Sequence, residues 1–380
     1  MKSVGIITYH HYYNYGTMLQ AFALQKKVEQ LGYRSEIIDF KQENKSSILE
    51  LIGIRLRRIP VYIKECKKYA ILAASKSLFA GREKQFEEFY KKKLKVSAQK
   101  YSCSNQIKDD PPIYDGYIVG SDQTWNPYVA KNPEAFYLTF VENDKKKGCY
   151  APSLAVSQLS DEQKNVFKTR LKNFSFLSCR EISGAKLLSE ILGRIVINVL
   201  DPTLLLSKND WDDVGLCKVT ADPYILVYFL GDVKEHRQFV HNLANKTGFK
   251  VVSIPVSYLD IADSLFEKKW VGPEGFLSLI KNAKYVCTDS FHGTMFSINF
   301  GVNFYSFCKK KDVEKKSENS RLYSSLELLG LSDRLITDAT ENSALTNLSD
   351  IDYHEVNIKL ERERIRSLSY LREMLAKITE

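Results

Sequence analysis

The stretch Thr288-Asp289-Ser290-Phe291-His292-Gly293-Thr294 decides the fold, because it has the pattern of a junction between a strand and a helix. The apolar run 283–287 directly before it predicts a short buried strand. In an open α/β sheet this edge is where ligands bind, and a helix start offers free backbone N–H groups to an anion. The helix is predicted from the apolar positions Met295, Phe296, Ile298 and Phe300.

His292 and Asp289 are the catalytic candidates of this stretch. A histidine titrates near neutral pH, so one at the carboxyl edge of a sheet can transfer a proton. A hydrogen bond from Asp289 would orient the His292 ring. The alternative is a purely structural histidine that the same hydrogen bond holds at the start of the helix. Ser290, Gly293 and Thr294 surround the helix start and are candidates for binding an anionic donor.

Strand and helix patterns alternate along residues 1–205, which favours a wound parallel sheet. The first unit has a buried strand at 4–8, a helix that Gly32 ends, and a second strand at 35–40. Further strands are expected at 114–119, 148–151, 174–179 and 196–200, with a helix at 161–173.

A second alternating series follows Asp222-Pro223 and predicts another α/β domain at 206–350. The last thirty residues, from about Tyr353, are expected to form one charged helix. Two α/β halves with a cleft between them are the simplest architecture for 380 residues. In the second half, strands are expected at 224–230, 250–254, 285–288 and 303–307, and helices at 234–246 and 273–282.

A basic helical insertion is predicted at about 46–98. Residues 55–100 hold fourteen Lys/Arg and four Glu, so this stretch accounts for the whole net charge of +9. One interpretation is a solvated helical insertion. The other is attraction to an anionic surface, either membrane headgroups or a phosphorylated carrier. Nucleic acid is not expected as a partner, since the stretch has no recognition motif and its aromatic residues fit helical core spacing.

The composition favours a globular protein of a reducing compartment. Seven cysteines, with no CxxC pair, indicate free thiols in a cytoplasm. No apolar run reaches the roughly 18 residues that cross a bilayer, and the first residues lack the pattern of a signal peptide. We expect a cytoplasmic protein. If the basic stretch binds anionic headgroups, the protein would also contact the inner face of a membrane. No cofactor is expected, and no metal, because no cluster of ligating residues has the required density.

Three further sites of interest lie at predicted strand ends. The loop 9–17 contains His10, Asn14, Tyr15 and Gly16 and is either a ligand loop or a capped turn. It lacks the GxGxxG pattern of dinucleotide binding.

The second of these sites is 120–126, with Ser121, Asp122, Gln123 and Trp125. Asp122 could accept hydrogen bonds from sugar hydroxyls, and Trp125 could stack on a sugar face. The alternative is a turn in which Asp122 accepts from local backbone N–H groups.

The third is Arg180-Glu181, where the arginine could bind a carboxylate or phosphate or form an internal ion pair. Arg321, before another helical segment, could likewise reach an anion or cap the helix.

Taken together, these motifs resemble the polysaccharide pyruvyl transferase family. The resemblance runs nearly end to end, over 14–24, 120–126, Arg180-Glu181, 201–206 and 288–294. It implies a GT-B-like fold of two Rossmann-like domains, with a C-terminal helix at 351–380 that packs back toward the N-terminal domain. It also implies that the enolpyruvyl unit of phosphoenolpyruvate is moved onto two hydroxyls of a sugar in a cell-surface polysaccharide or its lipid-linked precursor. The product is a pyruvate ketal, and phosphate leaves.

The resemblance assigns roles to the candidates. His292 would transfer a proton or bind phosphoenolpyruvate, with Arg180 as the main anion-binding cation and Arg321 in support. Asp122 and the loop 9–17 would face the sugar acceptor in the N-terminal domain. Many family members have Arg-Leu-His where this chain has Ser290-Phe291-His292. Either another cation replaces that arginine, or this chain uses a different donor.

Two rival functions share the architecture. One is a GT-B glycosyltransferase that uses a nucleotide sugar. The other is a non-catalytic carbohydrate-binding protein, in which loss of His292 would change affinity and nothing else.

Overall fold

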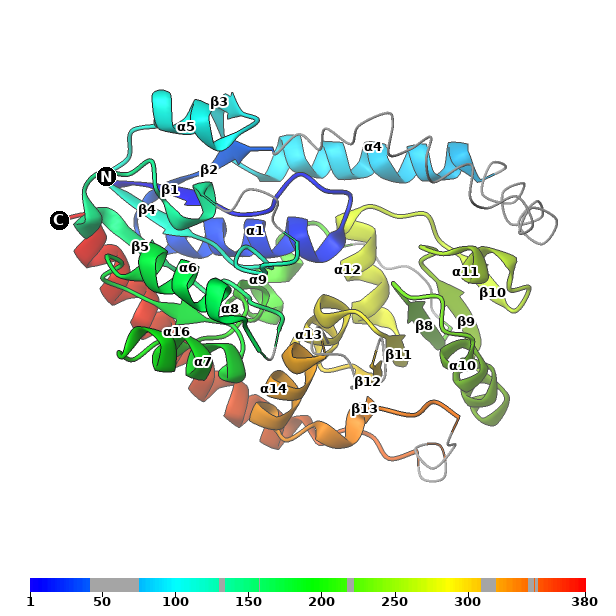
Figure 1. Cartoon of the computed structure of the whole chain (residues 1–380). Coiled ribbons are helices and arrows are strands. Elements are labelled where there is room, and N and C mark those ends of the chain that lie inside the picture. Colours follow the sequence, from blue (N-terminus) through cyan, green and yellow to red (C-terminus); the bar gives the residue numbers. More distant parts are fainter. Residues whose placement is uncertain are drawn as a thin grey trace, which may run out of the picture.

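Two lobes, each built on a parallel β-sheet with helices around it, form the computed structural model (Figure 1). We call them the N-terminal and the C-terminal lobe. The structure describes residues 1–41, 75–129, 134–156, 158–216, 222–308, 319–340, 345 and 348–380.

The sheet of the N-terminal lobe has the strand order β3-β2-β1-β4-β5, with every pair parallel. This is the order of a Rossmann-like half, in which the chain starts in the middle and winds outward in both directions. A single bridge, Gly148 to Phe176, links β5 to the segment before the short pair β6-β7, and another, Asp122 to Pro152, joins the loops after β4 and β5. Its elements are β1 (Ser3–Ile7), α1 (Tyr15–Gln30), β2 (Arg34–Phe40), α4 (Lys76–Lys93), β3 (Val96–Tyr101), α5 (Ser104–Asp109), β4 (Gly116–Val119), β5 (Lys147–Cys149), α6 (Asp161–Leu171), β6 (Ser178–Cys179), α7 (Ile182–Leu192), β7 (Ile197–Asn198), α8 (Pro202–Leu205) and α9 (Lys208–Asp212), with 3-10 turns at Ala135–Tyr137 and Asp144–Lys146.

The C-terminal lobe repeats this topology with six parallel strands in the order β10-β9-β8-β11-β12-β13. The predicted α/β class with two Rossmann-like domains is therefore confirmed. The elements are β8 (Tyr224–Tyr228), α10 (Lys234–Thr247), β9 (Lys250–Ser253), α11 (Tyr258–Ala262), β10 (Phe266–Lys268), α12 (Pro273–Asn282), β11 (Tyr285–Thr288), α13 (Phe291–Phe300), β12 (Asn303–Phe307), α14 (Ser320–Leu329), a 3-10 turn (Ser332–Arg334), β13 (Leu335–Ile336) and the last helix, α16 (Tyr353–Ile378).

The region predicted as a helical insertion needs a correction. Its described part is helix α4, which leads directly into β3, the edge strand beside β2. Residues 96–98, predicted to be helical, belong to that strand. The alternating polar residues of 96–101 hid it, because an edge strand has one face in solvent. Helix α4 is thus part of the connection between two neighbouring strands, and residues 42–74 lie outside the described part.

Helix α4 is exposed along most of its length, but it is not solvated on every side, since it lies across both lobes (Figure 1). Phe86 and Phe89 are fully buried in the core cluster that contains residues of both lobes. Arg82 Nη1 donates to the carbonyl of Pro255, and Gln85 exchanges hydrogen bonds with the backbone of Trp270 and Gly272. Burial of two phenylalanines is worth several kcal/mol, so this helix holds the C-terminal lobe against the N-terminal one.

Helix α16 crosses from one lobe to the other, as the resemblance implies (Figure 1). Its first half, at Val356 and Leu360, packs in the core cluster shared with the C-terminal lobe. Its second half, from Tyr370 to Ile378, packs against β1, α1 and β4 of the N-terminal lobe. The exact domain limits at residues 205 and 350 remain a prediction.

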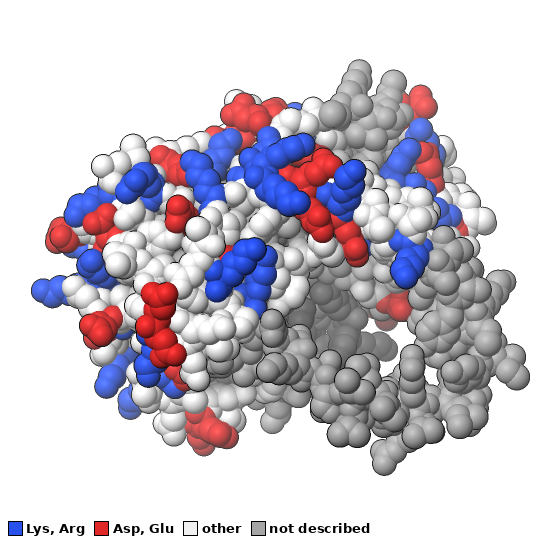
Figure 2. Space-filling view, turned by 90° about the horizontal axis from the view of Figure 1, so that it is seen from above, with Lys and Arg blue, Asp and Glu red and all other residues white. Residues whose placement is uncertain are grey.

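Six of the fourteen Lys and Arg of the basic stretch predicted to contact a membrane lie within residues 42–74, outside the described part of the chain, and the other eight lie within 76–100. On the face seen from above, the described Lys and Arg side chains are interspersed with Asp and Glu (Figure 2). Helix α4 itself places Glu87 and Glu88 beside Lys91–Lys93. No helix in the described ranges is both long and apolar enough to span a bilayer.

A buried histidine of the C-terminal lobe predicts acid sensitivity. His236 lies between the rings of Phe229 and Phe307, at centroid distances of 5.4 and 4.7 Å. Burial, with a smaller contribution from Arg237, lowers the pKa of His236 to about 4. The unfolded chain takes up this proton near pH 6.5, so the stabilisation is complete above that pH and is lost as the pH falls toward 4. We expect the loss to reach up to about 3 kcal/mol.

The measurement is the free energy of unfolding by denaturant between pH 7 and pH 4. His236→Phe keeps the ring packing and should flatten this dependence, whereas His354→Gln, at an exposed histidine, should not. Part of the slope should persist in His236→Phe, because burial also lowers the pKa of His11 to about 4. An unchanged slope in His236→Phe would contradict the prediction.

A buried charge cluster between the lobes

The carboxyl ends of both sheets meet at one place between the lobes. Arg180 follows β6, Asp201 follows β7 and caps α8, and His292 lies in the first turn of α13 after β11. Ser121 follows β4. We call these four residues, with Phe291, the Asp201 cluster. Asp201 was not among the residues predicted for the site, although the motif 201–206 was part of the family resemblance.

A single carboxylate oxygen is the centre of this cluster. Oδ2 of Asp201 accepts from Nη1 of Arg180 at 2.8 Å and lies 3.5 Å from Nε2 of His292. Burial opposes the charge of Asp201, but His292 and Arg180 outweigh it and hold the pKa of this carboxyl well below its usual range. Burial also opposes the charge of Arg180, yet the neighbouring carboxylates, Asp201 foremost, raise the pKa of its guanidinium. The carboxylate and the guanidinium are therefore both charged at neutral pH.

Three nitrogens of the cluster have no hydrogen-bond partner in the described part of the chain. They are Nε and Nη2 of Arg180 and Nε2 of His292. The side chain of Arg180 is 1% exposed and that of His292 is 9% exposed. Leaving buried donors unpaired costs about 1–3 kcal/mol each, more where the group is charged. Such donors fit a ligand that carries several acceptor oxygens.

The ring of His292 is held between the two lobes and is not enclosed in one of them. Its Nε2 faces Asp201, and its Nδ1 lies against Gly16 in the first turn of α1, where a Cβ atom would be only 2.0 Å away. Gly16 is therefore required for the close approach of α13 and α1.

The prediction that Asp289 orients the His292 ring needs a correction. The carboxylate of Asp289 accepts from the backbone N–H groups of Leu230 at 2.6 Å and Gly231 at 2.9 Å, at the end of β8. It thus fixes the loop after a neighbouring strand. The carboxylate beside the imidazole belongs to Asp201, which comes from the opposite lobe.

The small residues at the start of α13 are used largely within the protein. The hydroxyl of Ser290 accepts from the N–H of Gly293, as an N-cap does, and Gly293 makes room for Thr288. Thr294 is fully buried and shares a hydrogen bond with Ser306. Their side chains therefore shape the helix start, and their part in donor binding stays a prediction.

Arg321 joins the cluster through an aromatic ring. The guanidinium carbon of Arg180 lies 4.4 Å from the centroid of Phe291, and that of Arg321 lies 5.7 Å from it. Cation–π attraction to one ring thus brings a second guanidinium, from α14, to the same place. The ring stands in the position after Ser290, where many family members have the leucine of Arg-Leu-His.

The loop after β1 has two residues that organise the lobe contact. Asn14 caps α1, its Oδ1 accepting from the N–H of Thr17 at 3.1 Å. Tyr15 is 2% exposed, stacks on Phe276 at 4.3 Å and donates to the carbonyl of Val271 at 2.6 Å, all across the lobe contact. The motif Asn14-Tyr15-Gly16 thus joins the lobes. Tyr15 itself is committed to this lobe contact and not to a sugar acceptor.

Two further side chains predicted to face the acceptor, those of His10 and Trp125, are buried in the N-terminal lobe. His10 is fully buried, with Nδ1 bonded to the carbonyl of Thr8 and Nε2 to Asp39. Trp125 is 1% exposed and donates Nε1–H to the carbonyl of Phe136, although it also lines a small pocket of about 190 Å³ together with Tyr137.

The remaining residues of 120–126 lie closer to the cluster. Ser121 Oγ donates to Oδ2 of Asp201 at 3.3 Å. Asp122 has a left-handed backbone, with φ of 69°, and accepts from Thr17 Oγ1 at 2.8 Å. Gln123 is half-buried and accepts from Asn126. One oxygen of Asp122 thus faces the first turn of α1, and the other accepts from the N–H of Gln123 at 2.9 Å, as the alternative of a local turn predicts. Its contact with an acceptor stays a prediction.

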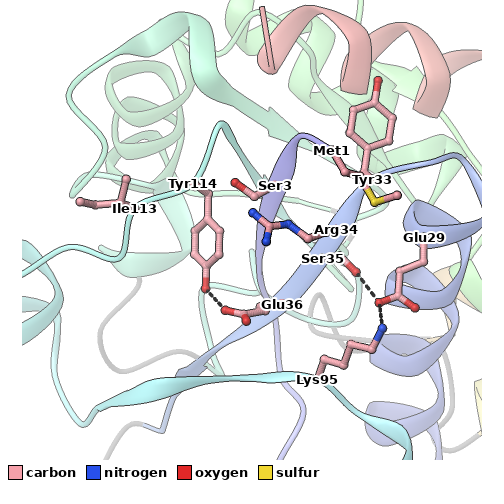
Figure 3. A pocket seen from close by; sticks show the side chains of 10 residues that line it. All are labelled: Met1, Ser3, Glu29, Tyr33, Arg34, Ser35, Glu36, Lys95, Ile113 and Tyr114. Carbon is pink, nitrogen blue, oxygen red and sulfur yellow. Dashed lines mark hydrogen bonds and ion pairs between the residues drawn. The ribbon is translucent and has the colours of Figure 1, made fainter.

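A separate pocket of about 540 Å³ lies at the opposite, amino edge of the N-terminal sheet (Figure 3). Within it, Tyr114 donates to Glu36, and Lys95 pairs with Glu29. None of the predicted site residues lines it. Across the described residues, no group of three or more His, Cys, Asp or Glu could hold a metal ion.

Fold and site define a two-lobed protein whose buried charges gather where two Rossmann-like sheets meet. The family model for polysaccharide pyruvyl transferase matches residues 14–307. The chain belongs to this family, as the sequence motifs predicted. A search of the curated proteins found no match.

Solved structures are similar over nearly their full length at low sequence identity. UDP-GlcNAc 2-epimerase from Neisseria meningitidis, bound to UDP-GlcNAc, is 10% identical, with coverage of 99% of this chain and 100% of that one and a TM-score of 0.49. The UDP-GlcNAc 2-epimerase from Methanocaldococcus jannaschii is 11% identical, with coverage of 94% and 91% and a TM-score of 0.47. Apo UGT2 from Phytolacca americana is 10% identical, with full coverage of both chains and a TM-score of 0.47.

Proposed function

We propose that this protein transfers the enolpyruvyl unit of phosphoenolpyruvate to two hydroxyls of a sugar and forms a pyruvate ketal. The observation that carries the proposal is the set of unpartnered nitrogens on Arg180 and His292, buried side by side between the lobes. A donor with one carboxylate and one phosphate offers the acceptor oxygens that these nitrogens lack.

The transfer needs one proton on carbon and a stabilised anion. Protonation of the methylene carbon of phosphoenolpyruvate gives a methyl group and an oxocarbenium-like centre. The first sugar hydroxyl adds to this centre and the second displaces the phosphate, so that two new C–O bonds replace the C–O bond to phosphate and the π bond of the enol. One hydroxyl proton replaces the proton given to carbon, and the other leaves with the phosphate. His292 is the proposed proton-transfer group, since its Nε2 has no other partner in the described residues.

Arg180 is the proposed main binding group for the donor. Its Nε and Nη2 form one edge of a guanidinium, which suits bidentate binding of a carboxylate or phosphate. Arg321, on the same Phe291 ring, is the proposed second cation. It would replace the arginine that stands before Leu-His in many family members, which favours an unchanged donor over a different one.

The acceptor is proposed to approach from the N-terminal lobe, where Asp122 follows β4. We infer a sugar of a cell-surface polysaccharide or of its lipid-linked precursor as the acceptor class, because the family acts on polysaccharides.

The test is incubation of the full chain with phosphoenolpyruvate and a panel of nitrophenyl and lipid-linked sugars. The expected result is phosphate release together with a product heavier by one pyruvylidene group. Arg180→Lys keeps the charge but loses the bidentate edge, and we expect the KM for phosphoenolpyruvate to rise about tenfold or more.

Two results would overturn the proposal. Thermal stabilisation by a nucleoside diphosphate and none by phosphoenolpyruvate would identify a nucleotide-sugar glycosyltransferase instead. Sugar binding with no phosphate release across the panel would identify a carbohydrate-binding protein.

A further inference from the structure

Asp201 uses its two carboxylate oxygens for different purposes. Oδ1 accepts from the N–H and the hydroxyl of Thr203, at 2.9 and 2.7 Å, and thereby caps the short helix α8. Oδ2 points the other way, toward Ser121, Arg180 and His292. Capping accounts for the first oxygen and leaves the second without a local structural role.

Oδ2 connects groups that are far apart in the sequence. Arg180 belongs to the N-terminal lobe and His292 to the C-terminal lobe, and this oxygen lies within ion-pair distance of both. The carboxylate is completely buried, a position that costs several kcal/mol unless the charge is well paired.

Oδ2 of Asp201 lies 3.5 Å from Nε2 of His292, and no hydrogen bond of good geometry forms between these two atoms. The carboxylate therefore acts on the imidazole through its charge and leaves the Nε2 position available to a ligand. On the other side the ring rests on Gly16, so the imidazole is confined between Asp201 and the first turn of α1.

We propose that Asp201 is a positioning residue of the transfer site, whose single oxygen Oδ2 aligns the guanidinium of Arg180 and the imidazole of His292 toward one shared ligand. The inference rests on the proposed function for its catalytic consequence. Its physical part, the coupling of Asp201 to His292, holds whatever the donor is.

The main test is Asp201→Asn, which keeps the amide oxygen that Thr203 needs but removes the charge. With phosphoenolpyruvate and an active sugar, we expect kcat to fall about 10- to 100-fold, with a smaller change in the KM for the sugar. In addition, because the carboxylate charge next to the imidazole is removed, the titration of the His292 ring should differ from that of the wild type, measured by ¹H–¹³C NMR of histidine-labelled protein. The His292→Gln spectrum identifies the signal.

The variant leaves the other charged side chains around the site in place: Arg180 and Glu181 after β6, Asp122 after β4 and Arg321 on α14. The matched control is Asp260→Asn, which removes another fully buried carboxylate that is paired with an arginine, Arg237. It should leave the His292 titration unchanged, so a shift in Asp201→Asn is specific to the site.

Loss of the carboxylate leaves Arg180 buried with less compensation, which can unfold the protein. The comparison of Arg180→Met with Arg180→Met/Asp201→Asn removes this problem, since the arginine charge is absent from both. The same change in the His292 titration is expected between them.

An unchanged titration of His292 in Asp201→Asn, or between the two Arg180→Met variants, would overturn the positioning role. A shifted titration in a protein that releases no phosphate from phosphoenolpyruvate would instead support the positioning role and contradict the proposed donor. The two proposals can therefore fail separately.

Discussion

His292→Gln is expected to lower kcat about 10³-fold with phosphoenolpyruvate and an active sugar acceptor, because a positioned proton-transfer group contributes about 10²–10⁴-fold. Glutamine keeps a polar side chain of similar reach between Asp201 and Gly16, so the lobes should remain in contact. It cannot give a proton to the methylene carbon. The measurement is the initial rate of ketal formation at saturating donor, together with the melting temperature.

The matched control is His241→Gln, on the outer helix α10, where the imidazole pairs with Asp263 at 2.7 Å. It removes a histidine–aspartate pair of the same kind away from the Asp201 cluster, and its kcat should stay within about twofold of the wild type. Wild-type turnover in His292→Gln would remove the imidazole from the mechanism.

Gly16→Ala is expected to lower kcat about 100-fold without any change in a chemical group of the site. A Cβ atom at this position would lie 2.0 Å from Nδ1 of His292, so the ring or the helix must move by more than 1 Å. A displacement of that size is enough to cost about 10²-fold in rate. In a helix, Gly→Ala would otherwise raise the free energy of unfolding by about 0.5–1 kcal/mol. A fall in that free energy would therefore report the contact with His292.

Gly81→Ala provides the control, because a Cβ at this glycine of α4 meets nothing within 4 Å. It should keep wild-type kcat and a slightly raised melting temperature. A double-mutant cycle then tests the mechanism: in the His292→Gln background, Gly16→Ala should cost little further activity. Full additivity of the two losses would show that Gly16 acts through something other than the ring.

Sequence and structure agree best for helices and strands whose short-range pattern of apolar residues marks a buried face. Hydrophobic periodicity placed β1, α1, β11 and α13 within a residue or two, since the apolar positions of these elements face a buried core. It missed β3, β10 and β13, which lie at or near sheet edges or are very short. Their exposed faces weaken the apolar signal on which the prediction depends.

The direction in which a polar side chain points is harder to predict from the sequence than the helix or strand to which it belongs. A polar or aromatic residue after a strand can point into the cleft or back into the lobe, and the sequence is the same in either case. His10 and Trp125 point back and complete their hydrogen bonds within the N-terminal lobe. Tyr15 points across into the other lobe.

The sequence by itself determined that His292, Arg180, Asp122 and Gly16 lie at strand ends or helix starts, because parallel strands joined by helices bring all their carboxyl ends to one edge. Only the tertiary structure decided which of them meet. The partner of His292 is Asp201, ninety-one residues away in the other lobe, and not Asp289, three residues away. Contacts between lobes depend on how two separately wound sheets dock, and no local pattern of residues records that docking.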